Sequence, residues 1–139
     1  MRLFRVLLPA LALGACHGSG KGEAASLDDA VDRYRRAEGA EQLSKMQAVT
    51  DLPCTIPEVC EAKAACLAAM APTTRALALR DEVARMLGDL QENRLPLDAA
   101  AAQELPGKLD EATRLLQEGR TKMAECDKKL ADLELHYGH

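Results

Sequence analysis

Aromatic residues are nearly missing from this chain. Its 139 residues include no Trp, one Phe and two Tyr. Because gripping bases or sugars by ring stacking needs exposed aromatic side chains, this shortage argues against binding surfaces of that kind. The charge balance, 18 Lys and Arg against 22 Asp and Glu, gives a net charge of −4 and no basic surface for nucleic acid. We therefore expect no nucleic-acid partner.

The sequence also lacks the motifs of common enzymes. It contains no G-x-S-x-G, P-loop or G-x-G-x-x-G sequence. Its clusters of Asp and Glu fall in the expected first turns of helices, where capping and the helix dipole explain them. General acid–base catalysis needs a carboxylate in a shaped, partly apolar cleft, and nothing in the sequence implies one. We predict a protein that is not an enzyme and has no cofactor.

Long apolar runs are missing too. No stretch of about 18 uninterrupted apolar residues is present, so the sequence predicts no transmembrane helix. A shorter, mostly apolar stretch, residues 3–13, lies at the N-terminus, with Arg2 before it and Arg5 near its start. A positive start followed by a short apolar stretch is typical of a secretory signal. We therefore predict a signal peptide over residues 1–15.

The signal ends in a more specific pattern. Leu13-Gly14-Ala15-Cys16 resembles the lipobox of bacterial lipoproteins, and this N-terminal segment alone carries the resemblance. The resemblance implies that Cys16 receives diacylglycerol and that cleavage falls just before it. It also implies a protein lipid-anchored in the bacterial cell envelope. His17, and not Asp, follows the cysteine. By the resemblance, this favours the outer membrane, facing the periplasm, over the inner membrane.

The predicted anchor is followed by a tether and then by helices. Residues 16–26, rich in Gly and small side chains, read as the lipidated cysteine and a flexible tether, and residues 27–139 as a helical domain. Ser26 is the predicted start of the first helix, Gly39 weakens its middle, and Pro72 should break the chain between two later helices. The predicted helices before the last one cover residues 26–49, 55–71, 73–93 and 99–104.

The last helix has the clearest pattern. Apolar and small residues alternate spacings of three and four up to Gly138, which should end the helix. The repeat consists of Leu109, Ala112, Leu116, Gly119, Met123, Cys126, Leu130, Leu133 and Tyr137. A repeat sustained for this length indicates packing against a partner helix throughout. With no period-two alternation, we predict an all-α fold: a disulfide-stapled bundle of three or four long amphipathic helices.

Four cysteines remain once Cys16 is assigned to lipid. An even number in an exported chain favours two disulfides among Cys54, Cys60, Cys66 and Cys126. A Cys60–Cys66 bond is excluded, because six helical residues rise ~9 Å and a disulfide joins Cα atoms less than ~7 Å apart. Helix faces favour Cys66–Cys126 with Cys54–Cys60. The alternative that stays open is Cys60–Cys126 with Cys54–Cys66.

Other chemistry for these side chains is disfavoured by their spacing. The cysteines form no C-x-x-C pair for zinc or redox work and no C-x-x-C-H for haem. His136 and His139 are three residues apart, but Gly138 between them should end the helix. We predict no metal site.

Two functions compete on this basis. The first is a non-enzymatic, lipid-anchored envelope protein whose helices bind another protein or a second copy of the chain. Its other partner is the membrane, through the N-terminal lipid. The alternative is a periplasmic carrier that holds a small ligand, a lipid or a metal, between its helices. A cavity inside the bundle would favour the carrier.

Overall fold

The computed structural model describes residues 20–138. The predicted signal peptide and the predicted lipidation site Cys16 lie outside these residues. The described chain folds into five helices and no strand, which confirms the all-α class. The helices are α1 (Gly20–Arg36), α2 (Glu41–Asp51), α3 (Pro57–Gln91), α4 (Ala100–Gln103) and α5 (Leu105–Tyr137).

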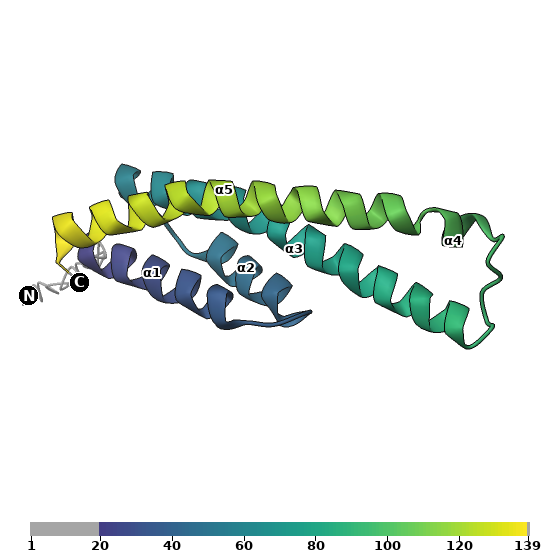
Figure 1. The fold of residues 1–139 in the computed structure, drawn as a ribbon. Coiled ribbons are helices and arrows are strands. Elements are labelled where there is room, and N and C mark those ends of the chain that lie inside the picture. Colours follow the sequence, from purple (N-terminus) through teal and green to yellow (C-terminus); the bar gives the residue numbers. More distant parts are fainter. Residues whose placement is uncertain (1–19, 139) are drawn as a thin grey trace, which may run out of the picture.

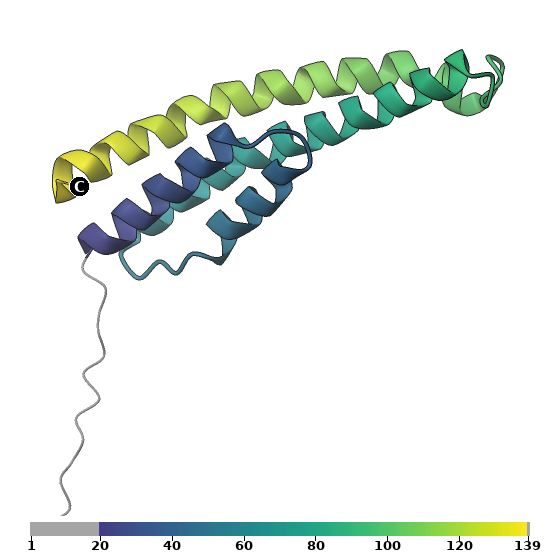
Figure 2. The same cartoon turned by 90° about the horizontal axis from the view of Figure 1, so that it is seen from below.

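Two long helices form the frame of the molecule. Helices α3 and α5, with 35 and 33 residues, are each about 50 Å long and run antiparallel, side by side. Helices α1 and α2 form a shorter hairpin that packs against one half of this pair (Figures 1 and 2). We call the part in which α1 and α2 pack on α3 and α5 the base. The rest of the α3–α5 pair, residues 75–119 with the short helix α4, is called the arm.

The base holds most of the core. Its largest fully buried side chains are Leu27, Met70, Val31, Val49, Val59, Cys66 and Cys126. The arm has a smaller cluster made of Ala76, Ala112 and Leu115, with Leu79 and Leu116 packed against it. Because hydrophobic stabilisation scales with the apolar area buried, the arm has a weaker core than the base.

The first helix begins earlier than predicted. Helix α1 starts at Gly20 and not at Ser26, so residues 20–26, expected in the tether, are helical. Ala24 and Leu27 are fully buried in the core of the base. Ser26 does not cap the helix, since its hydroxyl donates to the Gly22 carbonyl at 2.8 Å inside the helix. Packing therefore overrides a composition that is typical of a linker.

The single helix predicted over residues 26–49 is in fact two helices. Gly39 has a φ of +52°, a left-handed conformation that glycine adopts at little cost. The Ala37 N–H closes the end of α1 by donating to the carbonyls of Arg33 and Tyr34. The chain then turns back, which lets Val49 of α2 enter the core beside α1.

The predicted break at Pro72 was wrong, because Pro72 lies inside the continuous helix α3. A proline within a helix removes one backbone hydrogen bond and costs about 3 kcal/mol. Nearby carbonyls gain other donors: the Thr73 hydroxyl lies 3.1 Å from the Ala69 oxygen, and the Tyr34 hydroxyl 3.2 Å from the Met70 oxygen. Pro72 is itself buried, so packing offsets the cost.

The last helix matches its predicted pattern closely. Cys126, Leu130 and Leu133 are buried against the core, and α5 ends at Gly138, whose φ is +60°. The prediction fails at the arm end, where Leu109 is 46% exposed. The repeat predicts that α5 packs against other helices along its whole length, but in the arm this packing is incomplete.

Candidate functional site

The four predicted disulfide cysteines pair in the favoured way. Cys66 of α3 bonds Cys126 of α5, with Cα atoms 4.6 Å apart and both side chains fully buried. Cys54 bonds Cys60 and ties the α2–α3 loop to the first turn of α3, with Cα atoms 5.3 Å apart. Both bonds lie in the base, so covalent reinforcement is concentrated there.

The start of α1 and the end of α5 meet at one end of the base. A Cβ placed on Gly20 would lie 2.6 Å from the Tyr137 ring, so the two helix ends are in close contact. Figure 1 shows this end opposite the α4 end of the arm. The chain therefore enters the described structure at the end of the molecule farthest from the arm tip.

A carboxylate of α1 binds the segment that leads into α3. One Glu23 oxygen accepts the Thr55 N–H at 2.8 Å, and the other accepts the Thr55 hydroxyl at 2.5 Å. These bonds, first the one from the Thr55 hydroxyl, lower the pKa of Glu23 below its ordinary 4.5. Thr55 thus donates to Glu23 through both its backbone and its side chain, one residue before the N-cap position of α3, Ile56. Glu23 thereby joins α1 to the entry of α3.

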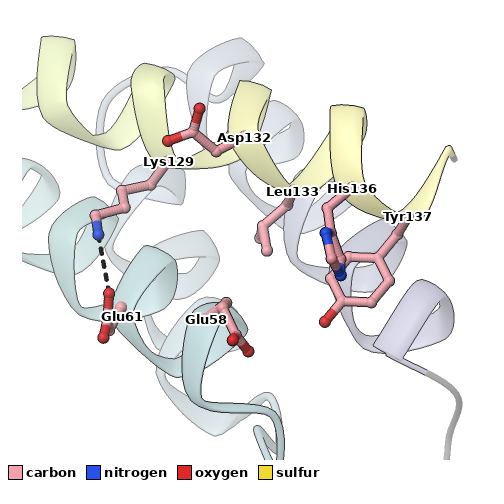
Figure 3. Close-up of a pocket in the computed structure, with 7 residues that line it drawn as sticks. All are labelled: Glu58, Glu61, Lys129, Asp132, Leu133, His136 and Tyr137. Carbon is pink, nitrogen blue, oxygen red and sulfur yellow. Dashed lines mark hydrogen bonds and ion pairs between the residues drawn. The ribbon is translucent and has the colours of Figure 1, made fainter.

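A small hollow lies at the α1 end of the base (Figure 3). It measures about 230 Å³, below the 300–1,000 Å³ common for small-molecule sites. Glu61 pairs with Lys129 across it at 2.9 Å, and this pairing raises the pKa of Lys129. The hollow is lined by Glu58, Glu61, Lys129, Asp132, Leu133, His136 and Tyr137. Its three carboxylates, Glu58, Glu61 and Asp132, are exposed to solvent.

Neither a metal-binding cluster nor a membrane-spanning helix is present in the described residues. Residues 20–138 contain no group of three or more His, Cys, Asp or Glu placed to hold a metal ion. Within the same range, no helix has the length and apolarity needed to cross a bilayer. His139 and His17 lie outside the described residues.

The most distinctive surface is the side of the arm that the α1–α2 hairpin leaves uncovered. The hairpin ends beside residues 74–78 of α3: the Thr74 hydroxyl lies 3.2 Å from that of Tyr34 in the last turn of α1, and Leu43 of α2 lines a hollow with Leu77. This end of the hairpin forms a step. Two surface hollows of about 290 and 280 Å³ lie beside the step, one lined by Leu43 and Leu77 and the other by Leu116 and Thr73.

Exposed leucines continue beyond the step along the same side. Leu109 is two helical turns from Leu116 and shares its face, and Leu87 shares the face of Thr73 through a seven-residue spacing repeated twice. Leu109 is 46% exposed, Leu87 45%, and Leu43 at the step 58%. We call this surface, Leu43, Leu77, Leu87, Leu109 and Leu116, the arm face.

The opposite side of the arm is polar. Arg75 pairs with Glu111 at 2.6 Å, and Lys108 with Glu82 at 3.1 Å, so ion pairs bridge α3 and α5 there. Glu111 lies about 200° around α5 from Leu109, which places the ion pairs away from the arm face. One side of the arm is therefore rich in leucine and has no helices packed on it. The other side has exposed ion pairs, which are stable in contact with water.

The arm face was not identified from the sequence. The α5 repeat contained the signal, since Leu109 and Leu116 belong to it, but periodicity cannot tell where a partner helix stops. Glu23 was missed for a related reason, because a hydrogen bond between residues 32 positions apart leaves no local pattern.

The chain matches no protein-family model, no curated protein and no solved structure.

Proposed function

We propose that this protein is a lipid-anchored component of the bacterial cell envelope, on the outer membrane facing the periplasm, and acts without catalysis as a helical interaction module. The observation that carries the interaction role is the arm face, a row of leucines next to the small core of the arm. Exposed leucines aligned on one side of two helices are typical of a protein contact, whereas single scattered leucines are ordinary surface.

The position of the arm supports an anchor at the other end. Cys16 precedes Gly20 by four residues, which span at most about 14 Å when fully extended. A lipid on Cys16 would therefore hold the base close to the membrane surface. The arm tip, beyond the far end of helices about 50 Å long, is then the part most free to meet a partner.

The two disulfides fit the same compartment. Disulfides form and persist in oxidising surroundings such as the periplasm and are rare in the cytosol. Both lie in the base, where they would protect the anchored end from unfolding.

The carrier alternative has less support. Holding a lipid or a metal between the helices would require a cavity within the bundle, and the core there is filled by residues such as Met70, Val59 and Leu27. The hollow in Figure 3 is small and rich in carboxylates. It does not favour a lipid.

Site-specific cross-linking in the intact bacterium tests the proposed function. A photoreactive amino acid replaces Leu109 on the arm face or, as a matched control, Leu135, which is 86% exposed on the base. We expect a discrete cross-linked protein product from position 109 and none from position 135. Absence of any product from position 109, with the protein present at normal amounts, would contradict the proposal.

A further inference from the structure

The arm face lies where the layer of helices that covers the α3–α5 pair ends. In the base, the α1–α2 hairpin lies on the α3–α5 pair as a second layer, and in the arm this layer stops while the pair continues (Figure 2). The part of α3 beyond the hairpin, residues 79–91, is about 20 Å long. Leu77 at the step and Leu87 beyond it lie on the same side of the helix pair as Leu109 and Leu116 of α5. A pair of helices is the element that would complete the layer.

The step restricts how a second copy could supply that layer. If two copies faced each other in parallel, both α1–α2 hairpins would lie between them. Each hairpin is about 10 Å thick, so the two arm faces would be held about 20 Å apart. In the antiparallel arrangement each hairpin lies beyond the tip of the other arm. The arms then meet directly and form a four-helix segment.

Charge along the arm favours the same arrangement. The tip of the arm, residues 86–109, has four carboxylates and two cationic side chains, a net charge of −2: Asp89, Glu92, Asp98 and Glu104 against Arg94 and Lys108. Residues 75–85 and 110–120, near the step, have five cationic and five acidic side chains and are balanced. Antiparallel pairing brings the acidic tip of one copy to this balanced region of the other. Parallel pairing would place the two acidic tips together.

We propose that the arm face is a self-association surface on which a second copy of this chain packs its own arm antiparallel, with a twofold axis across the middle of the arm. This inference rests on the proposed function only in taking the arm as the interaction element, and it does not depend on the lipid. Two arms of this size bury on the order of 1,000 Å² in total, near the lower limit for specific interfaces. The dimer therefore dissociates on dilution.

Sedimentation of the full chain in a density-matched detergent tests the association. We expect a reversible monomer–dimer equilibrium. Replacing both Leu87 and Leu109 by Asp should weaken it about 100-fold or more, because two carboxylates would be buried in the interface. The matched control, Leu135→Asp on the base, should leave the equilibrium unchanged. Circular dichroism of each variant shows whether the helices remain intact.

Spin-label distances test the orientation. Labels on Leu97→Cys at the tip, which is 83% exposed, should be about 30 Å apart in the dimer, and labels on Leu135→Cys more than about 70 Å apart. The unsubstituted chain, treated identically, is the control for labelling of native thiols. Short distances at both positions would mean a parallel dimer and would overturn the inference.

Two further outcomes separate this inference from the proposed function. If the chain is monomeric at all concentrations while the photoreactive group at position 109 captures a different protein, the arm face is an interaction site and the self-association is wrong. If the chain dimerises and the Leu87→Asp, Leu109→Asp variant dimerises equally well, the arm face is not the surface involved.

Discussion

At the scale of single residues, the closest approach of the two long helices depends on Gly119. A Cβ at this position would collide with the Thr73 hydroxyl and would lie 3.1 Å from the Ala69 carbonyl oxygen. The hydroxyl can rotate away, but the carbonyl belongs to the backbone of α3. The absence of a side chain at Gly119 therefore sets the spacing of α3 and α5 where base and arm join.

Replacing Gly119 by Ala should destabilise the protein by about 1–2 kcal/mol, since the forced shift outweighs the better helix propensity of Ala. Urea denaturation of the two proteins measures the difference. The control is Gly107→Ala, where a Cβ would meet nothing within 4 Å and where a gain of about 0.5 kcal/mol is expected. Equal effects at the two positions would show that the helices are not in close contact at Gly119.

Residue-level predictions succeeded where helix geometry alone decided them. Helix faces favoured Cys66–Cys126 over Cys60–Cys126, and the structure has that bond. Exposed ion pairs were less predictable. Glu118 pairs with Lys122 as its spacing indicates, but Arg114 also pairs with Glu118 and not with Asp110. Long surface side chains have several partners within reach, and spacing does not choose among them.

At the scale of the secondary-structure elements, the hydrogen bonds from Thr55 to Glu23 make the docking of α1 on the entry of α3 sensitive to pH. The pKa of Glu23 is lowered in the folded protein, so the ionised form stabilises the fold. That stabilisation is complete above the ordinary pKa of 4.5 and disappears as the pH falls through the folded value.

The variant Glu23→Gln should therefore be less stable than the parent at pH 7, and the difference should shrink below about pH 4.5. Thermal unfolding of both proteins between pH 3 and pH 7 gives the comparison. A matched control is Glu134→Gln, since Glu134 is exposed and forms no ion pair in residues 20–138. A difference in stability that stays constant with pH would mean that Glu23 does not stabilise the fold through its charge.

The two disulfides should contribute unequally to stability. The Cys66–Cys126 bond closes a separation of 60 residues and the Cys54–Cys60 bond one of 6, so the chain-entropy model gives about 4 and about 2 kcal/mol. Replacing each pair by Ala and measuring urea midpoints tests this order. A larger loss of stability on removing Cys54–Cys60 than on removing Cys66–Cys126 would contradict this order.

Element boundaries show where local rules stop. Gly39 was recognised as a weak point, but propensity cannot tell a weakened helix from a hairpin turn, because the decision depends on whether Val49 has a core to enter. Pro72 broke a local rule, yet it lies in the continuous helix α3 with its side chain buried in the core. In both places tertiary contacts override the local preference.

At the scale of the whole molecule, the sequence predicted the class of fold but not its division into base and arm. The division arises because α1 and α2, with 17 and 11 residues, are much shorter than the 35-residue α3. The sequence predicted one long first helix and two shorter middle ones, which would have made layers of similar length. Correct positions for two boundaries, at Gly39 and Pro72, are enough to change the outline of the molecule.

The lipid at Cys16 remains the prediction on which cellular location depends, and residue 16 lies outside the described structure. Acyl chains contribute about 0.8 kcal/mol for each buried methylene, so two or three chains give nearly permanent membrane attachment. Fractionation of the bacterium should therefore place the protein with membranes, and a Cys16→Ser variant should be released from them.

The most direct test is the mass of the N-terminal peptide of the protein isolated from the bacterial membrane fraction. We predict that residues 1–15 are absent and that Cys16 is the first residue, with a diacylglyceryl group on its sulfur. A peptide that still begins at Met1, or one with an unmodified sulfur on Cys16, would contradict the envelope anchor on which the proposed function depends.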